Sequence, residues 1–193
     1  MDEIQNQEQN QTQRPGMCFH YPNEPIFTIG ERDFYCGPAD LANAYSDWAA
    51  VIDCSGGLYL GENKGMSFPP GAERLYDHVI PVYQVAWADF SPPPVKFAFW
   101  KQLLQSLPEG PIVICCEGGH GRTGTAMAAL LLASGEYKSA SEALAAVREK
   151  YCHKAVETEE QGQYLIDYSD HLGNDEYMSS EDIEKALEDV TQS

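Results

Sequence analysis

The chain has 193 residues, of which 43% are hydrophobic, and its formal net charge is −18 at pH 7. This length predicts one domain with tails, and this hydrophobic content is enough for a core. The negative charge opposes binding to nucleic acid or to an anionic membrane surface. No stretch of the sequence approaches the roughly 20 apolar residues that cross a bilayer. We therefore expect neither a nucleic acid nor a membrane as a partner.

The two ends of the chain differ in composition from its middle. Residues 1–20 begin with a Gln- and Asn-rich stretch that lacks the basic and apolar regions of a signal peptide and is typical of a disordered leader. Residues 174–193 form an acidic tail, which we interpret as a solvated, partly helical end. The folded domain is then expected over residues 21–173. Six cysteines without a C-x2-C metal spacing favour reduced thiols and a cytoplasmic location.

Between the tails, short apolar segments alternate with segments of helical spacing. We predict strands at residues 27–29, 50–54, 79–83 and 112–114, and helices at residues 39–48, 97–107 and 126–133. Capping boxes at Ser139 to Glu142 and at Thr158 to Gln161 predict two further helices. Gly37-Pro38 predicts a turn. This alternation predicts an α/β fold with a mainly parallel central sheet flanked by helices.

The most informative motif is the loop Cys-Glu-Gly-Gly-His-Gly-Arg-Thr-Gly at residues 116–124, between a strand-like and a helix-like segment. Backbone N–H groups in such a loop hold a tetrahedral oxyanion, helped by the positive end of the following helix. Cys116 is then a candidate nucleophile, and Arg122 can clamp two phosphate oxygens at once. The expected phosphate-binding residues are Glu117, Gly118, Gly119, His120, Gly121 and Arg122.

A proton donor for the leaving oxygen is expected on a second loop. Asp89 lies in the proline-rich stretch Trp87-Ala-Asp-Phe-Ser-Pro-Pro-Pro94, between a predicted strand and a predicted helix. A loop can carry an acid over bound substrate and exclude water, as catalytic lids do. An aspartate that caps a proline turn is the alternative explanation. With the phosphate loop downstream, we interpret Asp89 as the general acid.

The phosphate loop resembles that of the cysteine-based tyrosine and dual-specificity phosphatases, whose pattern is HC-x-x-G-x-x-R-[ST]-G. The resemblance implies a phosphocysteine intermediate, no metal or other cofactor, and phosphotyrosine, phosphoserine or phosphothreonine in a protein as substrate. Residues 89–94 resemble the acid loop of the compact atypical dual-specificity branch. VIDCSGG and VETEEQ resemble the central strand of that branch and the segment that opens its last helix. The match covers about residues 26 to 168.

Three further residues, Thr123, Gln161 and Cys54, have two explanations each. The Thr123 hydroxyl can hydrogen-bond the cysteine sulfur and ease its departure, or it can cap the helix. The resemblance aligns Gln161 with a residue that orients the hydrolytic water, although the capping box already explains it. Cys54 ends the strand beside the catalytic strand, where relatives keep a redox partner for the nucleophile; an inert core thiol is the alternative. Glu117 at the pocket rim would repel a second phosphate.

Cys115 stands where the family pattern has a histidine that supports the loop. Without that histidine, the loop amides, the helix end and Arg122 must stabilise the thiolate. Two other functions therefore remain open. One is a phosphatase of a small metabolite, a nucleotide or an RNA 5′ end. The other is a phosphate-binding pseudophosphatase with weak catalysis.

Overall fold

The computed structural model describes residues 18, 22–44, 47–56, 71–75 and 78–175. Its strands are β1 (Phe27–Ile29), β2 (Arg32–Pro38), β3 (Ala50–Asp53), β4 (Gly71–Leu75), β5 (His78–Gln84) and β6 (Gly110–Cys116). Its helices are α1 (Ala39–Ala44), α2 (Ala98–Ser106), α3 (Gly121–Ser134), α4 (Ala140–Lys150) and α5 (Glu159–Asp175). Apart from Cys18, the predicted leader lies outside the described residues, as does the predicted tail from residue 176 onward.

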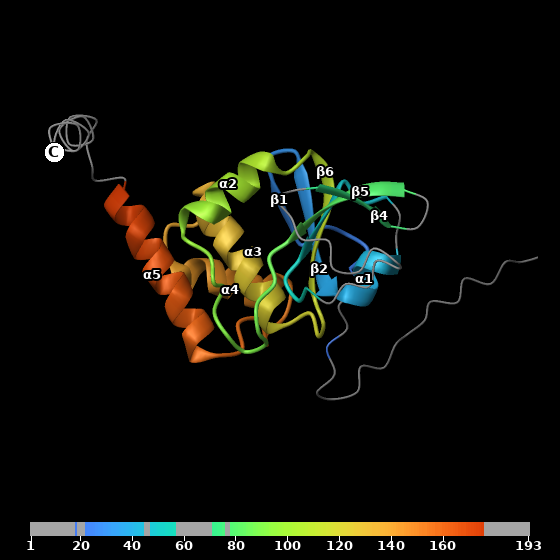
Figure 1. Cartoon of the computed structure of the whole chain (residues 1–193). Coiled ribbons are helices and arrows are strands. Elements are labelled where there is room, and N and C mark those ends of the chain that lie inside the picture. Colours follow the sequence, from blue (N-terminus) through green and yellow to red (C-terminus); the bar gives the residue numbers. More distant parts are fainter. Residues whose placement is uncertain (1–17, 19–21, 45–46, 57–70, 76–77, 176–193) are drawn as a thin grey trace, which may run out of the picture.

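The centre of the fold is one six-stranded sheet with the order β1-β2-β6-β3-β5-β4 (Figure 1). The four inner strands pair in parallel, and the edge strands β1 and β4 pair antiparallel to their neighbours. The phosphate-loop segment joins β6 to α3. The predicted α/β class, with a mainly parallel sheet and a loop between a strand and a helix, is confirmed. None of the described helices is both long and apolar enough to cross a membrane.

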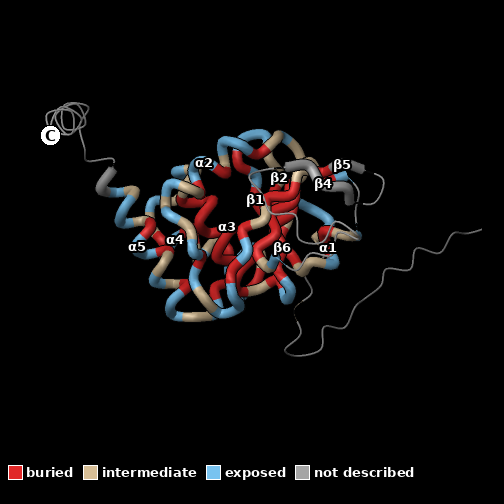
Figure 2. The backbone as a smooth tube through the Cα atoms, in the orientation of Figure 1, coloured by how far each residue is buried: buried red, intermediate tan, exposed pale blue. Residues whose placement is uncertain are grey.

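Successive side chains of β6 point alternately into two hydrophobic cores. Ile112, Ile114 and Cys116 face the larger core, formed with α2, α3, α4 and α5, whereas Val113 and Cys115 face the smaller core beneath α1. Figure 2 shows this buried centre in red, and β6 and α3 lie within it. The period of two along a strand makes this separation unavoidable. The adjacent thiols therefore lie on opposite faces of the sheet.

Helix α3 is the central helix of the larger core, because its residues from Gly121 to Leu132 are all buried. Apart from Arg122, its first six residues are glycine, threonine and alanine, which let neighbouring segments approach closely. A Cβ at Gly124 would lie 2.6 Å from the Cβ of Ala155. The helix ends at Gly135, whose φ of 77° is the left-handed conformation that glycine adopts at low cost.

The predicted turn at Gly37-Pro38 is wrong, because both residues continue β2 and pair with Cys115 and Cys116. Proline is tolerated there because the last residue of a strand need not donate a ladder hydrogen bond. The helix expected over residues 39–48 is also shorter than predicted: α1 ends at Ala44. The Trp48 indole instead donates a hydrogen bond to the carbonyl of Ala42 (3.2 Å).

The two predicted capping boxes are present in a modified form. The amide of Glu142 donates to the Ser139 hydroxyl at the start of α4, and the amide of Gln161 donates to the Thr158 hydroxyl at the start of α5. In the standard box the long side chain returns to the amide of the capping residue itself. Here the Glu142 side chain accepts a hydrogen bond from the amide of Lys138, one residue before the capping Ser139. The Gln161 side chain likewise accepts from the amide of Glu157, one residue before the capping Thr158.

Candidate active site

Cys116 ends β6, and only 3% of it is exposed to solvent. Its Sγ accepts a hydrogen bond from the amide of Gly119 (3.2 Å) across the loop. The loop that follows the strand therefore folds back toward the sulfur.

The conformation of this loop depends on Gly119. Its φ is 72°, and a Cβ there would lie 2.7 Å from both the carbonyl carbon of Gly37 and the nitrogen of Pro38. No side chain fits between the loop and the end of β2. On the other side, the buried hydroxyl of Tyr151 donates a hydrogen bond to the Gly119 carbonyl. Burial raises the pKa of Tyr151, which keeps this donor protonated.

The far end of the loop is held by the segment before α5. A carboxylate oxygen of Glu157 accepts a hydrogen bond from the amide of Gly121 (2.9 Å), the first residue of α3. A Cβ on Gly121 would lie 2.5 Å from that carboxylate oxygen and 3.0 Å from Oε1 of Gln161. Glu157 and Gln161 therefore pack directly against the start of the helix. The N-cap of α3, His120, makes no side-chain capping bond.

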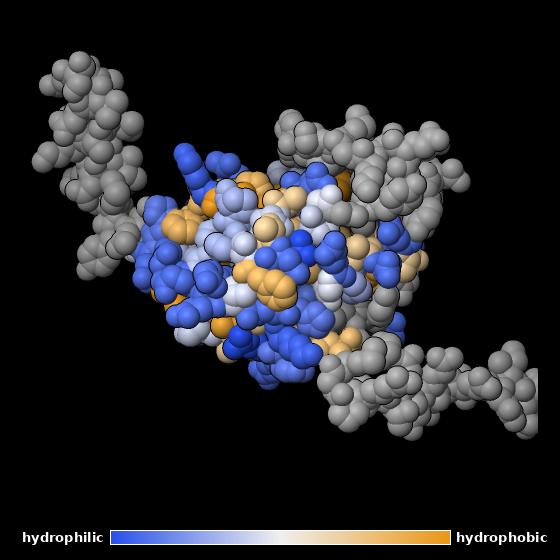
Figure 3. Space-filling view, turned by 60° about the horizontal axis from the view of Figure 1, so that its bottom comes forward, coloured by the Kyte–Doolittle hydropathy of each residue, from blue (hydrophilic) through white to orange (hydrophobic). Residues whose placement is uncertain are grey.

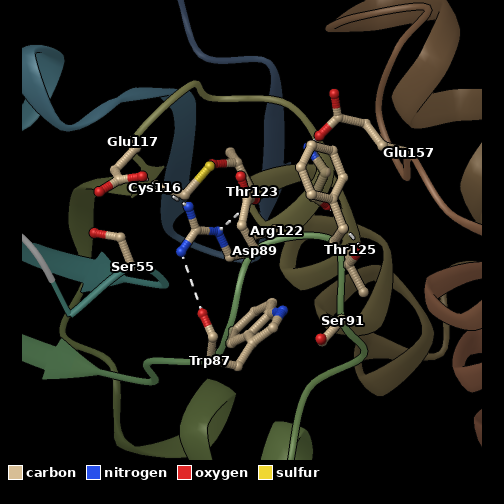
Figure 4. Close-up of polar contacts among 12 residues, drawn as sticks. Ser55, Trp87, Asp89, Ser91, Cys116, Glu117, Arg122, Thr123, Thr125 and Glu157 are labelled. Carbon is tan, nitrogen blue, oxygen red and sulfur yellow. Dashed lines mark hydrogen bonds and ion pairs between the residues drawn. The ribbon is translucent and has the colours of Figure 1, made fainter.

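Arg122 lies in the first turn of α3 and is only 4% exposed (Figure 4). Its Nη1 donates to the Trp87 carbonyl (3.2 Å), and its Nη2 contacts a carboxylate oxygen of Glu117 at 3.4 Å. Its Nε lies 3.2 Å from Oδ1 of Asp89. That ion pair lacks hydrogen-bond geometry, so among the described residues the Nε–H has no hydrogen-bond acceptor. The guanidinium is thus fixed at one end and offers a buried donor to an oxyanion.

The loop with Asp89 is attached to the start of α5. The Thr158 hydroxyl donates to the Phe90 carbonyl (3.0 Å), and Nε2 of Gln161 donates to the Ser91 carbonyl (3.3 Å). Phe90 itself has a φ of 61°, which is uncommon for a residue other than glycine. The Asp89 side chain is 50% exposed and faces Arg122. The sequence-predicted acid and the sequence-predicted phosphate loop therefore meet in space.

The remaining predicted site residues lie around this centre. Among the described residues, the Thr123 hydroxyl donates to the Gly37 carbonyl (3.4 Å), so its hydrogen bond is not to the sulfur. Gln161 is buried, with its amide side chain shared between Glu157 and Ser91. Gly118 is exposed. Glu117 is 74% exposed and pairs with Arg122, a contact that the sequence did not predict.

Three buried thiols lie near Cys116. The amide of Cys54 donates to the Cys115 carbonyl (2.8 Å), which extends the pairing of β3 with β6 and places Cys54 beside the catalytic strand as predicted. Cys36 lies on β2, on the other side of β6. Burial raises the pKa of Cys36, Cys54 and Cys115, and the nearby Cys116 raises each of them further. These three thiols are therefore held in the protonated form.

Sequence reasoning missed two residues that support the site, Tyr151 and Glu157, and one buried thiol near Cys116, that of Cys36. Glu157 lies inside the segment VETEEQ, whose resemblance was noted, but nothing in the segment singles it out as the acceptor for a loop amide. Tyr151 and Cys36 are distant from the loop in sequence. Only the packing of α4 and the parallel pairing of β2 with β6 bring them to it.

Comparisons with known proteins agree with this geometry. The sequence profile described as "Swiss Army Knife protein, DSP-PTPase phosphatase domain" matches residues 87–165, which include the acid loop, the phosphate loop and the start of α5. Residues 87–165 are therefore similar to a dual-specificity-type phosphatase domain. The fold of the chain is that of the dual-specificity phosphatases, which are the structural neighbours described next.

A crystal structure of Tk-PTP in the active form is 25% identical, with a TM-score of 0.54, over 77% of this chain and 97% of that chain. Human DUSP28 is 13% identical with a TM-score of 0.56, over 79% of this chain and 99% of that chain. PTPMT1 is 14% identical with a TM-score of 0.56, over 81% of this chain and 99% of that chain. At these identities, DUSP28 and PTPMT1 support the fold of the phosphatase domain.

Two proteins of Methanocaldococcus jannaschii also match part of this chain. MJ0215 is 45% identical over 60 residues, which are 31% of this chain and 35% of that protein. MJECL20 is 44% identical over 57 residues, which are 30% of this chain and 36% of that protein. The chain therefore aligns with about a third of the length of these curated relatives.

Proposed function

We propose that this protein hydrolyses phosphomonoesters on tyrosine, serine or threonine side chains of proteins, through a phosphocysteine intermediate. The observation that supports this most directly is the surroundings of Arg122. Its buried Nε–H has no hydrogen-bond acceptor among the described residues, and it lies between the loop of Cys116 and the carboxylate of Asp89. A dianionic phosphoryl group would supply the missing acceptor oxygens.

In the first step, the Cys116 thiolate attacks phosphorus while the loop amides and Arg122 bind the equatorial oxygens. The bond between phosphorus and the substrate oxygen breaks, and Asp89 gives its proton to the leaving oxygen. Arg122 must release the carboxylates of Glu117 and Asp89 to bind phosphate, and both are exposed enough to move away. This exchange leaves Asp89 adjacent to the phosphoryl group.

In the second step, the Asp89 carboxylate takes a proton from a water molecule, which attacks phosphorus and breaks the bond to sulfur. The products are inorganic phosphate and the Cys116 thiolate. Thr123 can assist by turning its hydroxyl from the Gly37 carbonyl to the departing sulfur. For Gln161 to orient this water, its amide must leave Glu157 and Ser91. Its proposed role therefore requires a rearrangement.

A protein substrate is supported by the rim of the site. Glu117 repels ligands with several phosphates, such as phosphoinositides or triphosphorylated RNA. Phe90, next to the acid, is 59% exposed and can pack against an aromatic ring or a peptide side chain. The face of the domain in Figure 3 is mainly hydrophilic with separate small apolar areas. We propose residues 21–173 as the catalytic domain and the cytoplasm as its location.

The test is hydrolysis of p-nitrophenyl phosphate by the full chain, followed by a panel of phosphopeptides, phosphoinositides, nucleotides and triphosphorylated RNA. Cys116→Ser should abolish turnover and retain oxyanion binding, whereas Cys115→Ser, the matched control, should keep much of the activity. An inactive wild type that still binds phosphate would identify a pseudophosphatase. Faster turnover of nucleotides or RNA than of every phosphopeptide would replace the protein substrate.

We also propose that Cys54 is the redox partner of Cys116. Peroxide oxidises the Cys116 thiolate to a sulfenic acid; Cys54 then gives up its proton, its thiolate attacks that sulfur, and the displaced hydroxide leaves with the proton as water. Activity should be lost and should return with thiol reductant. Peptide mapping checks the pairing, because a Cys36–Cys116 disulfide would move the role to β2. Sulfinic acid at Cys116 with both neighbours unmodified would exclude a protective disulfide.

A further inference from the structure

A second group of reactive side chains lies outside the catalytic centre. Cys18, Cys152 and His153 each offer one ligand atom, and these atoms all lie within 4.8 Å of one another. The two sulfurs are 3.7 Å apart. Cys152 is buried, Cys18 is half-buried against the larger core and His153 is exposed. The group therefore has an interior side made of thiols and a solvent-facing side made of imidazole.

This arrangement matches the needs of a zinc ion. Two thiolates bound at about 2.3 Å to a tetrahedral Zn²⁺ lie about 3.8 Å apart, which agrees with the separation here. A disulfide needs about 2.05 Å. Two thiolates and an imidazole select a borderline-soft ion such as Zn²⁺ over magnesium or calcium, which prefer oxygen. The exposed His153 leaves the fourth position to a solvent molecule.

The surroundings of Cys152 support a ligand role for its sulfur. The backbone amide of Lys154 donates a hydrogen bond to it (3.3 Å). Such outer hydrogen bonds orient metal ligands. No local sequence motif marks this group, because Cys18 and Cys152 lie 134 positions apart in the chain.

We propose that Cys18, Cys152 and His153 form a Zn²⁺ site that links Cys18 to the turn between α4 and α5. This site is separate from catalysis, which involves no metal in the function proposed above. Its position still matters for the phosphatase centre. Cys152 directly follows Tyr151, whose hydroxyl is bonded to the Gly119 carbonyl of the phosphate loop. A metal at Cys152 would therefore stabilise the anchor of that loop.

The experiment titrates Co²⁺, a spectroscopic substitute for Zn²⁺, into the full chain carrying Cys116→Ser, which removes the catalytic thiol as a competing ligand. A phosphine reductant keeps the other thiols reduced. We expect thiolate-to-cobalt charge-transfer absorption at one Co²⁺ per chain, displaced by Zn²⁺. Zn²⁺ at 100-fold above its dissociation constant should raise Tm by about 5–10 °C.

Cys18→Ser and Cys152→Ser should each weaken binding by more than about 100-fold, the upper range for losing an outer-shell partner of a ligand. His153→Ala should shift the cobalt spectrum and weaken binding. Cys36→Ala removes a buried thiol outside the group, so it should bind as its parent does. Near-ultraviolet circular dichroism without metal checks that each variant is folded.

Absence of a charge-transfer band, or a band that survives both serine substitutions, would overturn the proposal. So would reduced protein that binds no metal and forms a Cys18–Cys152 disulfide on oxidation.

Discussion

The two loops of the candidate active site are held in different ways. The phosphate loop, residues 117–120, lies between the end of β2, Tyr151 and Glu157, and at Gly119 it approaches its neighbours so closely that no Cβ fits. The acid loop around Asp89 is attached to α5 by two side-chain hydrogen bonds, and its residues Asp89 and Phe90 are exposed. Close packing together with hydrogen bonds positions the first loop, whereas two side-chain hydrogen bonds attach the second to the start of α5.

This difference corresponds to the two chemical roles that we propose for these loops. Oxyanion donors act best when they are already in place before the reaction, because no reorganisation is then needed. A general acid on a loop must approach bound substrate and let product leave. Each neutral hydrogen bond that holds the acid loop contributes only about 1 kcal/mol. The acid can therefore move without disturbing the oxyanion donors, and substitutions in the two loops should differ in severity.

The largest effect is expected for Gly119→Ala. Its Cβ would press on the backbone of Gly37 and Pro38, and alanine disfavours a φ of 72°. The loop must shift, and misplaced oxyanion donors should lower kcat/KM by about 10³-fold. Gly118→Ala is the matched control, because a Cβ there would meet only the His120 ring at 3.4 Å.

Both variants should be assayed with p-nitrophenyl phosphate after a thermal melt has shown that they are folded. A far smaller loss is expected for Gly118→Ala than for Gly119→Ala. Equal losses in two folded proteins would mean that close packing against β2 is not what positions the donors.

Asp89→Asn should lower kcat by about 10²-fold, the usual scale for losing a general acid. Its control is Glu117→Gln, which removes the other carboxylate that contacts Arg122. If Asp89 acts by proton transfer, only its loss should reduce kcat and flatten the basic limb of the pH profile. Glu117→Gln should keep kcat within a few-fold and lower KM, since it removes a negative charge that competes with phosphate.

Full pH–rate profiles of kcat for the two variants provide the measurement. A similar kcat loss in both would indicate that the carboxylates act together through Arg122, and the proton donor would then have to lie elsewhere in the site.

The sequence indicated the residues at the centre of the candidate site better than the residues that hold its loops in place. Cys116, Arg122 and Asp89 were recognisable because their motifs are local: strand, glycine-rich loop and helix in one case, and a proline-rich loop in the other. These inferences needed only short-range spacing, which secondary structure preserves.

The remaining features depend on contacts between distant segments. Gly37-Pro38 has the composition of a turn, but its pairing with the end of β6 overrides that local preference. The ion pair of Glu117 with Arg122 and the hydrogen bond of Tyr151 to Gly119 depend on side-chain packing that no local pattern encodes. The two capping boxes were located correctly, while their long side chains reach one residue further back than the motif specifies.

The smallest effect is expected for Thr158→Val, which removes the hydroxyl that donates to the Phe90 carbonyl while keeping the shape of the side chain. The acid loop then loses one of its two attachments to α5, so Asp89 should be correctly placed less often. We expect a kcat loss of about 3- to 10-fold, in line with one hydrogen bond of about 1 kcal/mol. The loss should be larger for phosphoserine peptides than for p-nitrophenyl phosphate, because a poor leaving group depends more on the proton from Asp89. Thr158 also caps α5 through the Gln161 amide, so the variant should lower Tm as well.

Thr158→Ser keeps both hydrogen bonds and should restore Tm and activity together, whereas Gln161→Glu removes the donor to Ser91 and leaves the Thr158 cap in place. If Gln161→Glu shows the same leaving-group dependence without loss of the cap, the attachment of the acid loop is the cause. Identical losses on both substrates would instead attribute the effect of Thr158→Val to the stability of α5.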